Sequence, residues 1–209
     1  MLSSLAKTAE GVNLRKVIER ITLLSNEITD GVILMRPFRF EDAEETFVAV
    51  RESLTDLKPW MSWAHDGYSI QDSKEFIRVT RARWQEGTLF AFVITDAKSG
   101  SVLGGCSLSH IHPVYHLCNL GYWVRTSRHG EGIAVRATKL AARYAFEKVG
   151  LIRVEVVMAI GNSASRRVAE KSGAHYEGIL RNRMVVGREV YDAHMYSLVP
   201  QDFGLIAHL

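Results

Sequence analysis

The stretch that most constrains the fold is RHGEGIA, residues 128–134, which lies between a strand-like run and a long helical pattern. Residues 117–124 favour a β-strand, and the apolar positions of residues 133–149 recur at helical spacing. Two glycines at such a junction let the backbone turn tightly and leave the first N–H groups of the helix unpaired, at the positive end of its dipole. The pattern predicts either an anion site or a plain connection.

The composition favours a soluble globular protein. A chain of 209 residues with 47% apolar content can bury the core of one domain. The formal charge of +3 rests on 18 arginines and 8 lysines, and ten of the arginines fall between Arg125 and Arg188. Arginine suits forked contacts with phosphate, but no run is basic enough to indicate nucleic-acid binding. The sequence contains no membrane-spanning or secretory stretch, so we expect a cytoplasmic protein.

Apolar residues of the segment 13–28 recur at the period of an amphipathic helix. Its apolar side needs a partner, which is either the rest of the chain or a second copy. We therefore expect residues 1–30 to form an N-terminal helical extension, residues 31–209 to form one domain, and a homodimer to be one possible assembly.

The remaining patterns predict an α/β (α+β) fold with a mixed, mostly antiparallel sheet of about six to seven strands flanked by helices. Residues 89–124 should form an antiparallel meander, and the strand that follows the long helix should lie parallel to the strand before it. Helices are expected over residues 41–54, 70–86, 133–149 and 162–171, and strands over residues 32–35, 89–95, 101–112, 117–124, 151–158, 174–186 and 189–198.

In the expected hairpin of residues 101–125, Cys106 faces Tyr122 and Cys118 faces His110, so the two cysteines should not form a disulfide. Histidines and cysteines of this hairpin are close in sequence, including His112, but their spacing fits no usual zinc pattern. We expect no metal site.

Several motifs follow one another along the chain, namely the sequence GYWV at residues 121–124, the glycine stretch, the sequence NSAS at residues 162–165 followed by Gly173, and Tyr191-Asp192 in the last strand. Together they resemble the GNAT acetyltransferases, and within them they are most similar to the RimJ/RimL-type N-acetyltransferases. The match covers about residues 32–200, and the order and spacing are more specific than any single motif.

The resemblance implies acetyl-coenzyme A as the acetyl donor. The N–H groups from His129 through Ala134 would hold its pyrophosphate, and residues 120–124 and 152–157 would splay apart to admit the pantetheine arm. Asn162 offers a donor and an acceptor to that arm, with helix capping as the alternative role. The residues implied in cofactor binding are Trp123, Val124, Arg128, His129, Gly130, Glu131, Gly132, Ile133, Ala134, Asn162 and Ser165.

The predicted catalytic residues are Ser165, Tyr122 and Glu155. Ser165 would donate a hydrogen bond to the leaving thiolate, and backbone N–H groups near Tyr122 or Trp123 would stabilise the oxyanion. Glu155 is one candidate base beside His110, His112 and Asp192. Trp60 and Trp63, in an irregular segment, are predicted to wall the substrate site, or else to fill the core.

Three positions depart from the family pattern. His129 stands where glutamine or arginine is usual, although Arg128 is adjacent, Ala169 replaces a tyrosine general acid, and Asn119 replaces a glutamate. Without an obvious base, an N-terminal α-amine or another low-pKa amine is the expected acceptor, and a small molecule such as an antibiotic or toxin is the second possibility. A catalytically impaired acyl-coenzyme A binding module is the alternative. An unrelated nucleotide-binding protein is disfavoured, because no Gly-Lys-Ser/Thr follows the glycines.

Overall fold

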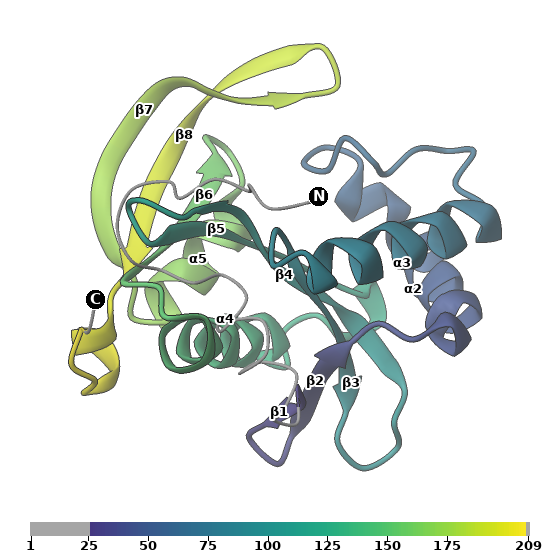
Figure 1. The fold of residues 1–209 in the computed structure, drawn as a ribbon. Coiled ribbons are helices and arrows are strands. Elements are labelled where there is room, and N and C mark those ends of the chain that lie inside the picture. The colour runs from purple at the N-terminus through teal and green to yellow at the C-terminus, as the bar shows by residue number, and fades with distance from the viewer. Residues whose placement is uncertain (1–25, 208–209) are drawn as a thin grey trace, which may run out of the picture.

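The computed structural model describes residues 26–207, in which helices cover both faces of one eight-stranded sheet (Figure 1). The strands are β1 (Ile28–Thr29), β2 (Ile33–Pro37), β3 (Phe90–Asp96), β4 (Val102–His112), β5 (Leu117–Val124), β6 (Arg153–Ala159), β7 (His175–Val186) and β8 (Glu189–Leu198). The α-helices are α2 (Ala43–Leu57), α3 (Ile70–Gln85), α4 (Ile133–Tyr144) and α5 (Ser163–Lys171). Short helical turns cover Phe40–Asp42, Thr126–Arg128, Ala145–Val149 and Pro200–Phe203.

The strand order is β1-β2-β3-β4-β5-β6-β8-β7, and every neighbouring pair is antiparallel except β5 and β6. These two run parallel because α4 carries the chain from the end of β5 back to the start of β6. The predicted meander and the predicted parallel pair are both confirmed.

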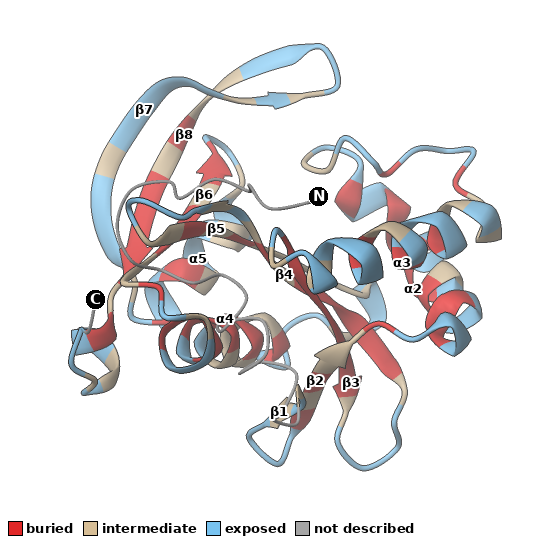
Figure 2. Ribbon diagram, in the orientation of Figure 1, coloured by how far each residue is buried: buried red, intermediate tan, exposed pale blue. Residues whose placement is uncertain are grey.

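Alternation along β5 sends its side chains to opposite faces of the sheet. Cys118 and Leu120 join the core that contains α4 and α5, packing with Ala137 and Ala141 of α4. Trp123 packs instead against the clusters formed under α2 and α3. The sheet thus separates an α4–α5 layer from an α2–α3 layer, as Figures 1 and 2 show.

The two parallel strands stay together over a short distance only. β5 and β6 pair from Leu117 opposite Arg153 to Asn119 opposite Glu155 and then part. The prediction that residues 120–124 separate from the next strand is confirmed. The predicted range 152–157 on β6 begins too early, because residues 153–155 are still paired with β5. We call the opening between the separated halves the β5–β6 gap.

The sheet has more strands than the predicted six to seven, since the short β1 pairs Ile28 with Met35 and Thr29 with Leu34. The predicted helix over residues 13–28 is therefore wrong at Ile28. Asp30 Oδ1 accepts the N–H groups of Val32 and Ile33, each at 3.0 Å, and this turn returns the chain onto β2. Residues 1–25, which hold the rest of that helix and most of the expected extension, lie outside the described residues.

The hairpin of β7 and β8 forms the last edge of the sheet and extends beyond it, turning at Gly187 (Figure 1). Most of β7 is exposed, whereas the second half of β8 is buried against β6 (Figure 2). Within residues 26–207 no helix is long and apolar enough to cross a membrane.

Both cysteines are buried and free. Cys106 pairs with Tyr122, as predicted, but Cys118 falls opposite an irregular stretch, because the register of β4 and β5 shifts between Ser109 and His112. His110, expected to face Cys118, lies in that stretch with a positive φ of 51°.

Candidate functional site

The β5–β6 gap exposes backbone groups of both strands. The N–H of Arg125 donates to the Leu103 carbonyl at 2.8 Å, and hydrogen-bonded pairs in an antiparallel ladder recur at every second residue. Trp123 therefore turns its backbone groups towards β4, whereas Tyr122 and Val124 turn theirs towards the gap. The regular pairing of β5 with β6 has already ended at Asn119, which leaves the N–H groups of Tyr122 and Val124 available to a ligand.

Backbone groups on the β6 side of the gap alternate in the same way. The N–H of Ile160 donates to the Asp192 carbonyl of β8 at 2.9 Å, so even-numbered residues at the end of β6 face β8. Val157 and Ala159 consequently face the gap. An extended ligand with amide groups can pair with both separated strands, as an added strand would.

The loop between β5 and α4 lies at one end of this gap. Gly130 and Gly132 have φ values of 84° and 77°, in the left-handed region that favours glycine. No side chain caps α4, and its first backbone bond runs from the N–H of Arg136 to the Gly132 carbonyl at 3.1 Å. In the described part of the chain, the N–H groups of residues 130–135 therefore have no protein acceptor. They form an exposed cradle suited to an anion at the start of a helix.

His129 differs from the sequence prediction. Its N–H donates to the Thr126 carbonyl at 3.1 Å within the helical turn Thr126–Arg128, so the cradle of free N–H groups begins at Gly130. Its ring Nε2 lies 2.9 Å from the Val124 carbonyl, and because a carbonyl only accepts, Nε2 carries the proton. The ring thus occupies a backbone acceptor at the edge of the gap.

The side chains next to the cradle are paired with each other. Arg128 contacts Glu131 at 2.7 Å and Asp96 at 3.5 Å. The hydrogen bond from Arg128 lowers the pKa of the Glu131 carboxyl. An incoming phosphate would therefore share the Arg128 guanidinium with Glu131.

The turn that precedes the cradle is fixed to α2. Glu52 accepts the N–H of Ser127 at 2.8 Å and forms an ion pair with Arg125, while Ser53 Oγ accepts the N–H of Thr126 at 3.0 Å. Hydrogen bonds from Arg125 and Ser127 lower the pKa of Glu52 to about 2. These contacts hold the end of β5 in a fixed position relative to the α2–α3 layer.

Ser165 and Tyr122 meet across the gap. Asn162 caps α5, since its Oδ1 accepts the N–H of Ser165 at 3.0 Å, so the capping role is confirmed. The hydroxyl of Tyr122 lies 2.9 Å from Ser165 Oγ and donates to the Ser165 carbonyl at 3.2 Å. Burial raises the pKa of Tyr122 to about 12, which keeps this hydroxyl protonated near neutral pH. The two predicted residues therefore form one hydrogen-bonded unit.

Glu155 lies at the foot of the gap, in the last parallel pair with Asn119, and contacts Arg153 Nε at 3.0 Å. It does not line the pocket described below. Ala169, where a tyrosine would be usual, is fully buried in the core beneath α5.

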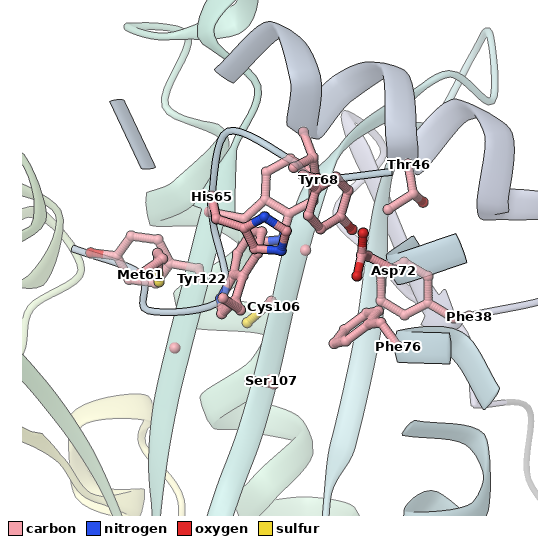
Figure 3. Close-up of a pocket in the computed structure, with 15 residues that line it drawn as sticks. Phe38, Thr46, Met61, His65, Tyr68, Asp72, Phe76, Cys106, Ser107 and Tyr122 are labelled. Atoms are coloured by element: carbon pink, nitrogen blue, oxygen red, sulfur yellow. The ribbon is translucent and has the colours of Figure 1, made fainter. Parts of the chain in front are cut away.

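A pocket of about 400 Å³ lies between the sheet and the α2–α3 layer (Figure 3). We call it the α2–α3 pocket. It is lined by Phe38, Thr46, Val50, Met61, Trp63, His65, Tyr68, Asp72, Phe76, Gly105, Cys106, Ser107, Gly121, Tyr122 and Trp123. Figure 3 shows Phe38, Thr46, Asp72 and Phe76 towards one end and Met61 and Tyr122 towards the other. The pocket thus leads from the gap into the space beneath the two helices.

The two predicted tryptophans have different positions. Trp63 lines the pocket, and its ring packs edge-on against Trp123 at a centroid distance of 6.2 Å. Trp60 does not line it. A methyl group placed on Gly161 would lie 3.6 Å from Trp60 Cη2. The Trp60 ring therefore reaches the turn between β6 and Asn162, on the β6 side of the gap.

Sequence reasoning missed the polar residues of the pocket, Thr46, His65, Asp72 and Ser107. Asp72 carries a capping signal, three residues after Ser69, and its hydrogen bonds with Ser69 lower its pKa. The sequence around Asp72 thus indicates a helix cap but not a place in a pocket wall, and the sequence around Thr46 indicates neither.

The other candidate bases, His110, His112 and Asp192, do not line the pocket. His112 stacks on Tyr115 at 4.4 Å, His110 bonds to Ser109, and Asp192 Oδ1 accepts the N–H of Asn182. Across the described residues, no group of three or more His, Cys, Asp or Glu side chains is placed to hold a metal ion.

Solved structures share this architecture. RimJ of Mycobacterium smegmatis, solved in complex with a CoA-disulfide, superposes with a TM-score of 0.76 and is 26% identical, covering 85% of this chain and 86% of RimJ. RimL, an acetyltransferase of ribosomal L7/L12 solved with coenzyme A, superposes with a TM-score of 0.74 at 18% identity, covering 80% of this chain and 94% of its own.

Sequence comparison leads to the same family. YdaF of Bacillus subtilis (strain 168), which is provisionally named a ribosomal N-acetyltransferase, is 29% identical over 171 residues, covering 82% of this chain and 93% of YdaF. The ribosomal-protein-serine acetyltransferase of Escherichia coli (strain K12) is 23% identical over 145 residues, covering 69% of this chain and 80% of its own. The model of the acetyltransferase (GNAT) domain matches residues 33–175, and the chain belongs to the GNAT acetyltransferase family.

Proposed function

We propose that this protein transfers an acetyl group from acetyl-coenzyme A to an amine, with a protein N-terminal α-amine as the preferred acceptor. One observation carries the proposal. The β5–β6 gap has an anion cradle at residues 130–135 and the hydrogen-bonded pair of Tyr122 and Ser165 in its wall, and it meets the α2–α3 pocket at Tyr122. Donor and acceptor can therefore enter from different sides.

The donor side fits coenzyme A. The pyrophosphate would bind the free N–H groups of the cradle, and the amides of pantetheine would pair with the backbone of Tyr122, Val124 and Val157. The structure of Mycobacterium smegmatis RimJ with a CoA-disulfide supports this assignment by similarity. Cβ atoms added at Gly130 and Gly132 would meet nothing within 4 Å, so the space over the cradle is open to a ligand.

The reaction proposed is direct attack of the neutral amine on the thioester carbonyl. The nitrogen–carbon bond forms, negative charge develops on the carbonyl oxygen, and the carbon–sulfur bond then breaks. The departing thiolate takes up the proton that the nitrogen loses, so the products are the amide and the coenzyme A thiol. The gap-facing N–H of Tyr122 would stabilise the oxyanion, and the Ser165 hydroxyl would donate a hydrogen bond to the thiolate. Burial raises the pKa of the Cys106 thiol and disfavours its thiolate form, so we assign this cysteine no role as a nucleophile.

The acceptor must lose a proton before or during attack. An α-amine with a pKa of about 8 is roughly one-tenth neutral near pH 7, while a lysine with a pKa of about 10.4 is less than one-thousandth neutral. Positioning beside the thioester then supplies much of the rate. The name of the Escherichia coli relative, a ribosomal-protein-serine acetyltransferase, agrees with a protein acceptor.

The test is an acetylation assay on a peptide that has both a free N-terminus and an internal lysine. We expect acetylation of the α-nitrogen, located by tandem mass spectrometry, and no more than background acetylation of the lysine. Preferential acetylation of the lysine would contradict the proposal.

A second function, an acyl-coenzyme A binding module without catalysis, is motivated by Ala169 and Asn119. The hydrogen-bonded pair of Tyr122 and Ser165 argues against the binding module. It places a protonated tyrosine hydroxyl in the wall of the gap, although Ala169 stands where many GNAT enzymes have a tyrosine. Tight coenzyme A binding without turnover in a broad amine screen would favour the module.

A further inference from the structure

The end of the α2–α3 pocket that lies away from the gap carries two polar side chains. Thr46 comes from α2 and Asp72 from α3, and Figure 3 shows both beside Phe38 and Phe76. Neither residue belongs to the donor side of the site.

Thr46 is 2% exposed, and its Oγ1 is buried without a hydrogen-bond partner within the described residues. Buried hydroxyl groups in folded proteins almost always have a partner, because the lost contact with water is otherwise uncompensated. Thr46 lines the pocket, and within the described residues no protein group competes for its hydroxyl with a donor from an occupant.

Asp72 is only half engaged by the protein. Its Oδ2 accepts the N–H of Ser69 at 2.8 Å and the Ser69 hydroxyl at 2.7 Å, while Oδ1 has no partner in the described chain. Asp72 is the one carboxylate in the pocket wall, and among the described residues the wall contains no lysine or arginine. His65 and Tyr68 also belong to the wall. The Asp72 carboxylate is ionised near neutral pH, and hydrogen bonds with Ser69 lower its pKa further.

The walls around these two groups are aromatic. Phe38 and Phe76 pack edge to face at 5.2 Å, and Tyr68, Trp63 and Trp123 line the rest of the pocket. Aromatic faces attract cations, and the attraction increases where water is excluded. An apolar, aromatic pocket with one carboxylate therefore favours a positively charged group.

This charged group cannot be the reacting nitrogen. The amine that attacks must reach the gap beside Tyr122 on β5, whereas Figure 3 shows Thr46 and Asp72 at the opposite end of the pocket. Residues of the neighbouring strand β4 also line the wall. Neighbouring strands are about 4.8 Å apart. An apolar spacer must therefore separate the two nitrogens.

We propose that the acceptor carries a second cationic nitrogen, held by Asp72 and Thr46, at the end of a short apolar spacer. The inference rests on the proposed function and names its substrate class. The shared chemistry occurs in a free diamine and in a peptide whose first residue is lysine.

Calorimetric titration in the presence of coenzyme A tests the site without turnover. The probes are pentane-1,5-diamine, which reproduces the spacing of the two nitrogens of an N-terminal lysine, and n-pentylamine, which lacks the second nitrogen. We expect the diamine to bind at least tenfold more tightly. Equal affinities, or no binding of either probe, would overturn the proposal.

Two variants assign the effect to residues. Asp72→Asn retains a capping oxygen but removes the charge, and it should reduce the preference for the diamine to less than threefold. Thr46→Val should weaken diamine binding several-fold without affecting n-pentylamine. Asp66→Asn is the matched control, because Asp66 is exposed, pairs with Lys58 and does not line the pocket. A preference that survives Asp72→Asn would reject the assignment.

Turnover then separates the two sources of the ligand. A higher kcat/KM for peptides beginning with lysine than for peptides beginning with norleucine identifies a peptide acceptor, and turnover of the free diamine alone identifies a small molecule. If peptides are acetylated regardless of their first residue and no diamine binds, the proposed function stands and this inference fails. If the diamine binds but no amine is acetylated, the binding site stands and the acetyl transfer fails.

Discussion

The β5–β6 gap and the α2–α3 pocket meet at Tyr122 but are built in different ways. The gap is made mainly of backbone groups, namely the separated edges of two strands and the free N–H groups of residues 130–135. The pocket is made mainly of side chains, which come from both helices of the α2–α3 layer, the segment between them, β4, β5 and Phe38 just after β2. A ligand common to a family can be recognised by backbone geometry, while the choice of acceptor depends on side chains that are free to vary.

The largest effect expected within the gap is that of Ser165→Ala. Loss of a hydrogen-bond donor to the leaving thiolate should lower kcat about 100-fold, with little change in KM for acetyl-coenzyme A. Ser163→Ala, in the same first turn of α5 but exposed, is the control for helix stability. Steady-state kinetics with a peptide acceptor would measure both, and equal activities of the two variants would remove Ser165 from the mechanism.

Gly132→Val tests whether the cradle works through its backbone. A bulky side chain over the N–H groups should weaken coenzyme A binding by about tenfold or more, or about 1.4 kcal/mol, measured by titration. Gly150→Val is the matched control, because Gly150 has a φ of 79° and equally open space at the far end of the long helical segment. Both variants have the same backbone strain, so only the first should lose affinity. Similar losses would mean that strain, not the cradle, explains the effect.

Tyr122→Phe should have a smaller effect on kcat than removal of Ser165. It deletes the hydroxyl that lies 2.9 Å from Ser165 Oγ, a hydrogen bond of about 1 kcal/mol, which corresponds to about a fivefold decrease. Kinetics of the double variant provide the control. If the two residues act as one unit, the double variant should be no slower than Ser165→Ala, and independent losses would contradict the coupling.

Thr46→Val should stabilise the protein against unfolding while weakening diamine binding in the α2–α3 pocket. Removal of a buried hydroxyl without a partner should raise the free energy of unfolding by about 1 kcal/mol, measured by urea denaturation. Thr80→Val is the contrasting control. Its hydroxyl is also buried in a helix but donates to the Phe76 carbonyl at 2.9 Å, so its loss should not stabilise. Destabilisation by Thr46→Val would show that the hydroxyl already has a partner in solution.

The smallest expected effect on stability is that of Glu52→Gln, which removes the ion pair between α2 and Arg125 at the end of β5. The folded-state pKa of Glu52 is about 2, below its ordinary value of 4.5, because Arg125 and Ser127 hydrogen-bond to it. A depressed pKa contributes stability above pH 4.5, and that contribution is lost as the pH falls towards 2. For this partly exposed pair, Glu52→Gln should cost about 0.5–1 kcal/mol at pH 7 and less at pH 3. A cost that does not vary with pH would contradict the ion pair.

The gap was predictable because its motifs are local. The glycines of residues 128–134, Asn162 with its cap, and the parallel crossover can each be recognised over a few neighbouring residues. His129 was assigned incorrectly in part, because the sequence does not reveal the helical turn Thr126–Arg128 that uses its N–H. Of the pocket wall, the sequence indicated Trp63, Tyr122 and Trp123. It did not indicate Thr46 and Asp72, which are brought together only by the packing of two helices over the sheet.

The most direct test of direct acetyl transfer is a single-turnover measurement with isotopically labelled acetyl-coenzyme A, excess protein and a peptide with a free N-terminus. Rapid quench and mass spectrometry would follow the label. We predict that labelled acetyl appears on the α-nitrogen in step with free coenzyme A, with no acetylated protein at any time. Label that accumulates on the protein first, or coenzyme A released without acetylated peptide, would contradict the account.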